Sequence, residues 1–352
     1  MTDTNAAPAP KNPSPAAPGF VVQLMQPGIG RLAVMTIVIF IAMAALSPEH
    51  FLTIGNASSM AFQFPEFAIL SLAMMLAMLT GGIDLSIIGI ADLSAIIAAL
   101  ILSHFAGANA TGVEAGGAMA LAIVVSLAIG CVAGMFNGIV IAYFGLPAIL
   151  ATLGSGLVFT GLGFAITGGS AVVGFPGVFA VIGNADLFGI PVPLIIFVSL
   201  AVAVWFLLER TAFGIKVQML GTNPLATRFA GIDDAGVTIR TFTYSGGLAA
   251  VAGLIIMSRS NSAKADYGSG YLLLTILICV LGGINPYGGF GKVSGLILAV
   301  LSLQFLSSGF NMLQASNFFT QFLWGSLLLV VMAVNTIQFR RRAARSSSKA
   351  HV

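Results

Sequence analysis

Three carboxylates, Glu66, Asp84 and Asp92, lie within or at the edge of long apolar stretches. An acid at membrane depth costs about 2.5 kcal/mol or more on insertion scales, so it usually faces a polar cavity or a partner group. Asp84 directly follows a Gly-Gly-Ile sequence, and we expect it to cap the next helix. For Glu66 and Asp92 two interpretations stay open: a hydrogen-bonded acid buried among helices, or a group that lines a path for a polar solute.

Glu66 and Asp92 should lie at similar depths in a membrane. Glu66 lies about eight residues from one end of its apolar stretch and Asp92 lies eight residues beyond Asp84, so each is roughly 12 Å deep at about 1.5 Å per residue. In a hydrocarbon core of about 30 Å these depths differ by only about 6 Å. No Lys or Arg is expected deep in any span. We therefore hypothesise that both acids line a translocation path, solvated, protonated or hydrogen-bonded to a group such as Asn137.

The pair Asn137-Gly138 lies inside another apolar stretch. A buried Asn needs hydrogen-bond partners, and a Gly lets a neighbouring helix approach closely. A structural role is the first interpretation of this pair, and a role of Asn137 in the path is the second. Cys131 and Cys279 also fall in apolar stretches, where we expect small core residues and not a disulfide or metal ligands.

Motifs of enzymes are absent from the sequence. Residues 291–293 (Gly-Lys-Val) lack the Ser or Thr that completes a phosphate-binding loop, and His50, His104 and His351 are not spaced as zinc ligands. A GxSxG nucleophile elbow is also missing. We therefore predict no catalytic residue, no metal site and no cofactor bound by this chain, and nothing in the sequence points to a nucleic-acid partner. If ATP drives the activity, ATP and Mg would be bound by another chain.

The composition is that of a protein embedded in a lipid bilayer. The chain has 352 residues, of which 58% are hydrophobic and 7% are charged, and its mean hydropathy is +1.04. An ordinary soluble domain has about 25% charged residues, so these few charges cannot cover a soluble surface of this size. Apolar runs of about twenty residues also exclude an outer-membrane barrel, whose strands alternate over about ten residues. The predicted fold class is an all-α polytopic membrane protein.

The apolar runs predict about ten spans for a hydrocarbon core of about 30 Å. Their approximate limits are 31–46, 58–80, 84–103, 117–143, 148–168, 192–208, 239–259, 271–283, 292–311 and 317–338. The span at 271–283 is short and ends at Gly282-Gly283, so we expect a broken or re-entrant helix there. Residues 1–28 are predicted to be a disordered tail, residues 29–339 the membrane domain, and residues 340–352 a basic tail.

The distribution of Lys and Arg predicts the orientation of these spans. If both ends of a ten-span chain are cytoplasmic, 12 of the 14 basic residues fall on the cytoplasmic side, and Arg259 and Lys264 fall outside. This bias follows the positive-inside rule. It places both tails and the polar segment 209–240 in the cytoplasm, where a soluble partner could reach that segment.

The segment from Glu209 to Arg240 is the one long polar stretch between spans, and it contains the signals of a short helix. Asn223 can accept a hydrogen bond from an early helical N–H, and Pro224 suits the first helical position. Gly231 can end the helix in the left-handed conformation. Because a helix of about seven residues is marginal alone in water, this one must dock against something.

The short helix has an apolar face of its own. Leu225 and Phe229 are four residues apart and therefore lie on the same side of the helix. We predict that these two side chains supply apolar contact with a soluble partner and that Arg228 supplies a polar or ionic contact.

Six motifs occur in an order that resembles one family of membrane proteins. They are TGGIDLS (80–86), MFNGIVIAYFGLPAILATLG (135–154), AFGIKVQMLGTNPLATRFAGI (212–232), SGGLAAVAGLI (245–255), YGSGY (267–271) and LGGINPYGGFGKVSG (281–295). Together they resemble the permease subunit of ABC importers for ribose, xylose and arabinose, over essentially the whole chain after residue 30. The motif residues that carry this resemblance include Gly81, Gly82, Asp84, Gly138 and Gly283.

The resemblance implies a type II-like importer permease of about ten helices in the bacterial inner (plasma) membrane. Two permease copies, or one copy and a paralogue, would pair as a dimer on a cytoplasmic ABC ATPase, and a periplasmic sugar-binding protein would deliver a monosaccharide. The short helix matches the family's coupling segment, which docks on the ATPase. The coupling residues would then be Asn223, Pro224, Leu225, Arg228, Phe229 and Gly231.

Two departures from the family pattern bear on the substrate. Residues 87–92 (IIGIAD) replace a run of small residues, and Leu272 stands where the family often has an acid. The substrate therefore stays open between a pentose or hexose and a sugar alcohol, deoxysugar or related small polyol. The alternatives from other classes are an ion-driven secondary transporter with Glu66 and Asp92 as proton sites, and a membrane enzyme that acts on lipid-linked sugars.

Overall fold

The computed structural model describes residues 27–107, 110–316, 318–320 and 322–333 of the chain. The elements in chain order are α2 (Pro27–Leu46), α3 (Pro48–Phe51), α4 (Ile54–Leu79), α5 (Ile87–Phe105), α6 (Gly112–Phe144), α7 (Ala148–Thr167), η1 (Gly177–Ala180), α8 (Val181–Asn184), β1 (Asp186–Leu187), β2 (Ile190–Pro191), α9 (Val192–Arg210), α10 (Ala212–Thr222), α11 (Pro224–Phe229), α12 (Asp234–Ser260), α13 (Tyr271–Leu281) and α14 (Val293–Met312). The predicted tails lie outside the described residues, except that α2 already begins at Pro27.

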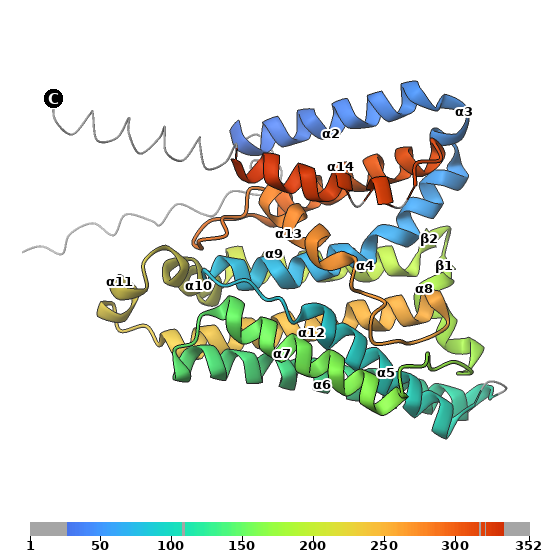
Figure 1. Ribbon diagram of the computed structural model, residues 1–352, viewed down its shortest axis with the longest axis horizontal. Coiled ribbons are helices and arrows are strands. Elements are labelled where there is room, and N and C mark those ends of the chain that lie inside the picture. The colour runs from blue at the N-terminus through green and yellow to red at the C-terminus, as the bar shows by residue number, and fades with distance from the viewer. Residues whose placement is uncertain (1–26, 108–109, 317, 321, 334–352) are drawn as a thin grey trace, which may run out of the picture.

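The long helices run back and forth between the two ends of one bundle (Figure 1). Within the described residues, eight helices are long and apolar enough to cross a membrane, and Tyr271–Leu281 and Phe318–Ala333 are shorter apolar helices. The structure thus confirms an all-α polytopic membrane protein with about ten apolar helices. At about 1.5 Å per residue, the 11 residues of α13 cover about 16 Å, roughly half of the hydrocarbon core.

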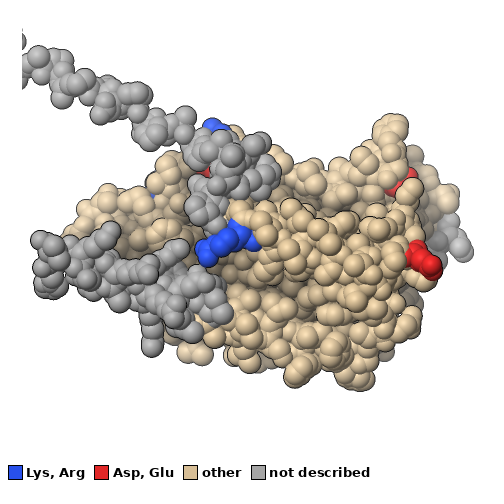
Figure 2. All heavy atoms as spheres, turned by 90° about the horizontal axis from the view of Figure 1, so that it is seen from above, with Lys and Arg blue, Asp and Glu red and all other residues tan. Residues whose placement is uncertain are grey.

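The bundle has two distinct ends. We call the end that carries α10 and α11 the inner end, and the end that carries α3, α8 and the β1–β2 hairpin the outer end (Figure 1). On one side of the molecule, Figure 2 shows a broad surface without charged side chains between Lys and Arg toward the left and Asp and Glu at the right. Among the described Lys and Arg residues, those in or beside the inner-end turns are Arg31, Arg210, Lys216, Arg228, Arg240 and Lys292.

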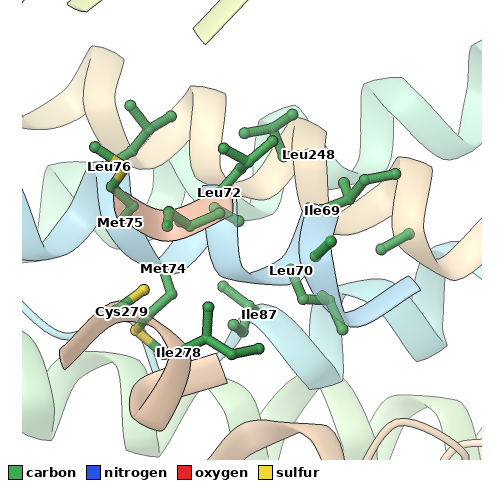
Figure 3. Packing of buried hydrophobic residues seen from close by; sticks show 14 of the residues in the cluster. Ile69, Leu70, Leu72, Met74, Met75, Leu76, Ile87, Leu248, Ile278 and Cys279 are labelled. Atoms are coloured by element: carbon green, nitrogen blue, oxygen red, sulfur yellow. The ribbon is translucent and has the colours of Figure 1, made fainter. Parts of the chain in front are cut away.

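The centre of the bundle is α4 packed against α12, α9 and α13. Every residue of α4 from Phe64 to Leu79 is buried, whereas α2, α6, α7 and α9 turn most of their side chains outward. Figure 3 shows Leu72 of α4 on the side of Leu248 of α12, and Met74 next to Ile278 and Cys279 of α13. Cys279 is fully buried, as expected of a core residue.

Helices α6 and α12 approach each other through glycines. Gly130, Gly134 and Gly138 recur every four residues and so share one face of α6. A Cβ on Gly134 would overlap the backbone of Phe242, and a Cβ on Gly138 would overlap the backbone of Ile239, both in α12. Small residues at this spacing let two helix backbones meet, which membrane helices need because apolar side chains gain little by leaving lipid. The structural role predicted for Gly138 is therefore confirmed.

The two Gly-Gly sequences end helices at the same end of the bundle. Gly81 has φ of 85° just after α4, and Gly283 has φ of 79° just after α13, so both occupy the left-handed region that glycine adopts without strain. Both α4 and α13 end toward the inner end (Figure 1). The loops that follow them touch each other, because the N–H of Gly289 donates a hydrogen bond to the carbonyl of Leu79 (3.0 Å).

The chain re-enters the bundle between α12 and α13. After α12 ends at Ser260, residues 261–270, here called the re-entrant loop, run inward without forming a helix before α13 begins. Ala263 and Ala265 in this loop are each 1% exposed. Ala263 pairs with Val172 through two backbone hydrogen bonds (2.8 and 2.9 Å), so part of the loop's backbone is satisfied by protein. Non-helical backbone at membrane depth is tolerated where protein covers it, and the structure agrees with the broken helix that the sequence predicts.

Candidate functional site

The short helix α11 projects from the inner end between α10 and α12 (Figure 1). Before it, Oδ1 of Asn223 accepts a hydrogen bond from the N–H of Ala226 (3.0 Å), and Pro224 occupies the first turn. After it, Gly231 has φ of 72°. These contacts confirm the signals for a helix that begins and ends at these positions, although α11 has six residues where about seven were expected.

The outward face of α11 is apolar and its inward face is polar. Leu225 is 64% exposed and Phe229 is 86% exposed. Thr227 is 1% exposed, and its hydroxyl donates a hydrogen bond to the carbonyl of Asn223 (2.8 Å). Sequence reasoning did not identify Thr227, yet its place is readable: it lies two residues from both apolar side chains, which on a helix is the opposite side. The helix thus buries Thr227 and presents Leu225 and Phe229 to its surroundings.

The arginine of α11 has an ionic partner within the chain. Nε of Arg228 contacts Oδ2 of Asp234, in the first turn of α12, and the two side chains are 68% and 25% exposed. The sequence analysis expected Arg228 to serve a soluble partner and did not foresee this internal pair. The reason is local geometry, because the turn at Gly231 brings the start of α12 back alongside α11.

Helix α10, which the sequence analysis did not predict, joins α11 to the bundle. Its residue Gly221 lies against the end of α4 and the loop after α13, since a Cβ at this position would overlap the Leu79 carbonyl oxygen and the Gly289 nitrogen. Gly289 in turn donates its N–H to Leu79 (3.0 Å). We call Leu79, Gly81, Gly221, Gly288 and Gly289 the inner junction. Three segments that are far apart in the sequence meet there through their backbones. The contact is this close because Gly221, Gly288 and Gly289 have no Cβ.

Asp84 is the centre of a buried polar network. Its Oδ1 accepts hydrogen bonds from the N–H (3.1 Å) and hydroxyl (2.6 Å) of Ser86, and its Oδ2 accepts one from the Ser245 hydroxyl of α12 (2.8 Å). Nδ2 of Asn137, in α6, donates to the same Ser86 hydroxyl (2.7 Å). The N-cap of α5 is Ser86, not Asp84 as expected. The carboxylate instead holds the turn before α5 and ties it to α6 and α12.

Asn137 therefore lies with Asp84 and not with the other two acids. Its partner is Ser86, and Oδ1 of Asn137 is buried without a hydrogen-bond partner among the described residues. The structure supports the structural interpretation of Asn137. The expected contact of Asn137 with Glu66 or Asp92 is not present among the described contacts.

Glu66 has a basic partner, contrary to the expectation that no Lys or Arg would neutralise it. Nη1 of Arg259, in the last turn of α12, lies 2.7 Å from Oε1 of Glu66, and the Tyr271 hydroxyl donates to Oε2 (2.7 Å). The charge distribution predicts that Arg259 lies on the outer side of the membrane, but α12 continues to Ser260 and directs this side chain toward Glu66 of α4. Side-chain exposure is 6% for the acid and 25% for Arg259, so the pair is largely desolvated.

Asp92 binds the re-entrant loop. The N–H of Gly268 lies 3.3 and 3.4 Å from its two carboxylate oxygens, and Asp92 is 3% exposed. Glu66 contacts Tyr271, three residues further along the chain. Both acids thus hold the YGSGY motif (267–271) in place, one through a backbone N–H and one through a phenol. Their contribution to a translocation path stays a prediction.

The comparison with protein families decides the class of this protein. Residues 56–332 match the family described as branched-chain amino acid transport system / permease component. The chain belongs to this permease family. The match covers every long helix except α2, and it includes α11, the inner junction and all three carboxylates. Within the described residues of this permease, no group of three or more His, Cys, Asp or Glu side chains could hold a metal ion.

Relatives of this permease carry a more specific name. The autoinducer 2 import system permease protein LsrD of Yersinia pseudotuberculosis (serotype O:1b, strain IP 31758) is 31% identical over 320 residues, which cover 89% of this chain and 91% of the relative. The protein of the same name from Yersinia pestis (strain Pestoides F) is 30% identical with the same coverage. No solved structure matches the chain. The prediction of an importer permease is confirmed by the family and these relatives.

Proposed function

We propose that this chain is the membrane subunit of an ATP-driven ABC importer that carries a small polyhydroxylated molecule across the bacterial inner membrane. The observation that carries the proposal is α11, a capped helix at the inner end whose Leu225 and Phe229 are exposed. Exposed large apolar side chains on a short, anchored helix favour burial in a partner. The proposed partner is a cytoplasmic ABC ATPase, which would bind ATP and Mg, while this chain binds neither.

The inner junction offers a physical route from the ATPase to the bundle. A displacement of α11 moves α10, and Gly221 of α10 bears directly on Leu79 and Gly289. These residues end α4 and follow α13, the helices that carry Glu66 and Tyr271. A cavity of about 320 Å³ lies between α10 and α12, and its lining includes Lys216 and Arg240. This cavity widens the surface on which an ATPase could dock. Two-state repacking at such a contact is how packed elements transmit motion.

The substrate we propose is a monosaccharide of the ribose and xylose type, or the autoinducer 2 for which the Yersinia relatives are named. A sugar alcohol, deoxysugar or small polyol has the same hydrogen-bonding character. An ion-driven mechanism with Glu66 as the proton site is less consistent with the structure, because Arg259 already neutralises this acid. We retain Asp92 and Glu66 as proposed lining residues of the translocation path, whereas the hydrogen bond from Asn137 to Ser86 favours a structural role for Asn137.

The assembly we propose has four kinds of component. A second copy of this chain or a paralogue would pair with it in the membrane, the ATPase would bind at the inner end, and a periplasmic binding protein would deliver substrate at the outer end. Both termini would be cytoplasmic, in keeping with the Lys and Arg residues at the inner end.

Phe229→Asp tests the coupling assignment. Because a charge in an apolar groove is strongly unfavourable, we expect co-purification of the ATPase with the permease to fall by at least about tenfold, with membrane insertion unchanged. Phe188→Asp is the matched control, since Phe188 is 96% exposed at the outer end in the β1–β2 turn. Normal ATPase binding and ATP-dependent uptake by the Phe229 variant would show that α11 is not the docking element.

A further inference from the structure

A polar cavity of about 350 Å³ opens at the outer end, away from the acids described above. It lies between the first half of α4 and the last turns of α14. Its walls include Asn56, Ser59, Gln63, Ser307, Ser308 and Asn311. A volume of this size is at the lower end of the range for small-molecule sites, which is about 300–1,000 Å³.

The floor of the cavity is fixed by hydrogen bonds. The Ser308 hydroxyl donates to Oδ1 of Asn56 (2.8 Å), and Nδ2 of Asn56 donates to the carbonyl of Phe51 (2.9 Å). Asn56 is 6% exposed and Ser308 is 8% exposed. This pair joins α4 to α14 across 252 positions of sequence. The floor is therefore a preorganised surface that does not depend on a ligand.

The walls carry unused hydrogen-bonding groups. Ser59 and Gln63 are four residues apart on α4, and Ser307 and Asn311 are four residues apart on α14, so each pair lines one helix face. Within the described part of the chain, the side chains of Gln63 and Asn311 take part in no hydrogen bond, and both residues are exposed. Ser59 is exposed as well, and Ser307 is half-buried.

Lipid cannot cover these groups without a large cost. Gln63 is nine positions from the start of α4 at Ile54, about 14 Å along the helix at 1.5 Å per residue, in a helix that is long and apolar enough to cross a membrane. An amide without a hydrogen-bond partner in hydrocarbon costs several kcal/mol, of the order of 4 or more. The open side of the cavity must therefore face water, a polar solute or another protein surface.

The charge around the cavity narrows the class of solute. No Lys or Arg contributes to its lining, and the ionisable groups are Glu49 and His50 at the α3 edge. A carboxylate or phosphate would enter without a counter-charge and would meet Glu49. A neutral molecule rich in hydroxyls can satisfy amides and hydroxyls in both directions, because each of these groups both donates and accepts.

We propose that this cavity is the outer vestibule of the translocation path and that it binds a neutral polyhydroxylated solute as the solute enters the bundle. The proposal rests on the importer function proposed above and assigns its entry site. Gln63 and Asn311 are the wall groups that hydrogen-bond the solute, and the Asn56–Ser308 pair is the floor that orients them. Glu66 lies about one turn further along α4 than Gln63 and contacts Tyr271 at the start of α13.

Cysteine accessibility tests whether the cavity is wet. Ser59→Cys and Ser199→Cys are a matched pair, since both serines are exposed on membrane-crossing helices and Ser199 lies on the outward face of α9. In the full transporter in proteoliposomes, a charged, membrane-impermeant thiol reagent should modify Ser59→Cys at least about tenfold faster than Ser199→Cys, because lipid excludes the reagent from α9. The unsubstituted chain, which keeps Cys131 and Cys279, gives the background. Equal rates would overturn the vestibule.

Protection and transport then test the solute. Ribose should slow modification of Ser59→Cys, and leucine, which carries a carboxylate, should not. Protection by leucine and not by ribose, or by neither, would overturn the assignment. With ribose as the probe, Gln63→Leu and Asn311→Leu should raise the KM for uptake by about tenfold at unchanged ATPase binding, which is about 1.4 kcal/mol of lost interaction. If wild type takes up ribose with ATP and these variants keep its KM, the vestibule fails and the importer function stands. If wild type takes up no ribose, ribose is excluded as its substrate, and the difference in labelling between Ser59→Cys and Ser199→Cys still decides the cavity.

Discussion

The two halves of α4 have opposite surroundings although they belong to one continuous helix. From Phe64 to Leu79 every residue is buried, whereas between Ile54 and Gln63 only Asn56 is buried. The inner half is surrounded by α12, α9 and α13, and its position is fixed by close packing. The outer half faces the last turns of α14 across a cavity, and Ser59 and Gln63 line that cavity. A helix that is central at one end and open at the other can hold a bundle together and still present a surface to a solute.

The largest expected effect comes from breaking the ion pair at the border of the two halves. Glu66→Ala leaves the Arg259 guanidinium in a largely desolvated place, and removing one partner of a buried pair costs about 3–5 kcal/mol. We expect about 3 kcal/mol, because Arg259 is one quarter exposed. Thermal unfolding in detergent measures the loss. Asp266→Asn is the control, since its pair with Lys264 (3.1 Å) is on the surface and should contribute little. Equal stability of the two variants would mean that the border pair is solvated.

An effect of intermediate size on stability should distinguish the inner half of α4 from its outer half. Leu72→Ala removes a side chain that is fully buried in the inner half, and the cavity left behind should cost about 2 kcal/mol, the lower end of the range for Leu→Ala because lipid offers little transfer term. Met60→Ala, in the outer half, removes a side chain that is only partly buried. The midpoint of thermal unfolding of the Met60→Ala variant should stay close to that of the wild type. A loss at Met60 as large as at Leu72 would show that the outer half is packed in the assembled protein.

The smallest effect should come from Asp92, which holds the re-entrant loop through the backbone N–H of Gly268. Asp92→Leu leaves the N–H of Gly268 without an acceptor, at a cost of about 1–3 kcal/mol, and Asp92→Asn keeps an acceptor. We expect the Asn variant to fold and transport as the wild type does, and the Leu variant to be less stable with a lower turnover. Uptake by reconstituted complexes at matched expression measures the turnover of both variants. Wild-type turnover of a stable Leu variant would remove Asp92 from the transport mechanism.

Local signals in the sequence were sufficient for α11 and for the approximate positions of the long apolar helices. The caps of α11 at Asn223 and Pro224 and its end at Gly231 depend on residues within one turn, and the limits of the long helices follow from hydropathy. The Gly-Gly breaks after α4 and α13 are readable for the same reason, because positive φ is a property of single residues. Helix α10 was missed because its mixture of polar and apolar residues gives no clear apolar run.

The sequence by itself therefore determined the fold class, the approximate positions of the apolar helices, the short helix α11 and the family motifs. Only the tertiary structure decided which polar groups meet: Arg259 with Glu66 across 193 positions, Gly268 with Asp92 across 176, and Ser308 with Asn56 across 252. Such pairs depend on the rotation and depth of each helix in the bundle, which composition and periodicity leave undefined. A shift of one residue turns a helix by about 100°, so a polar side chain at a given depth faces a partner or a cavity only once its neighbours are packed.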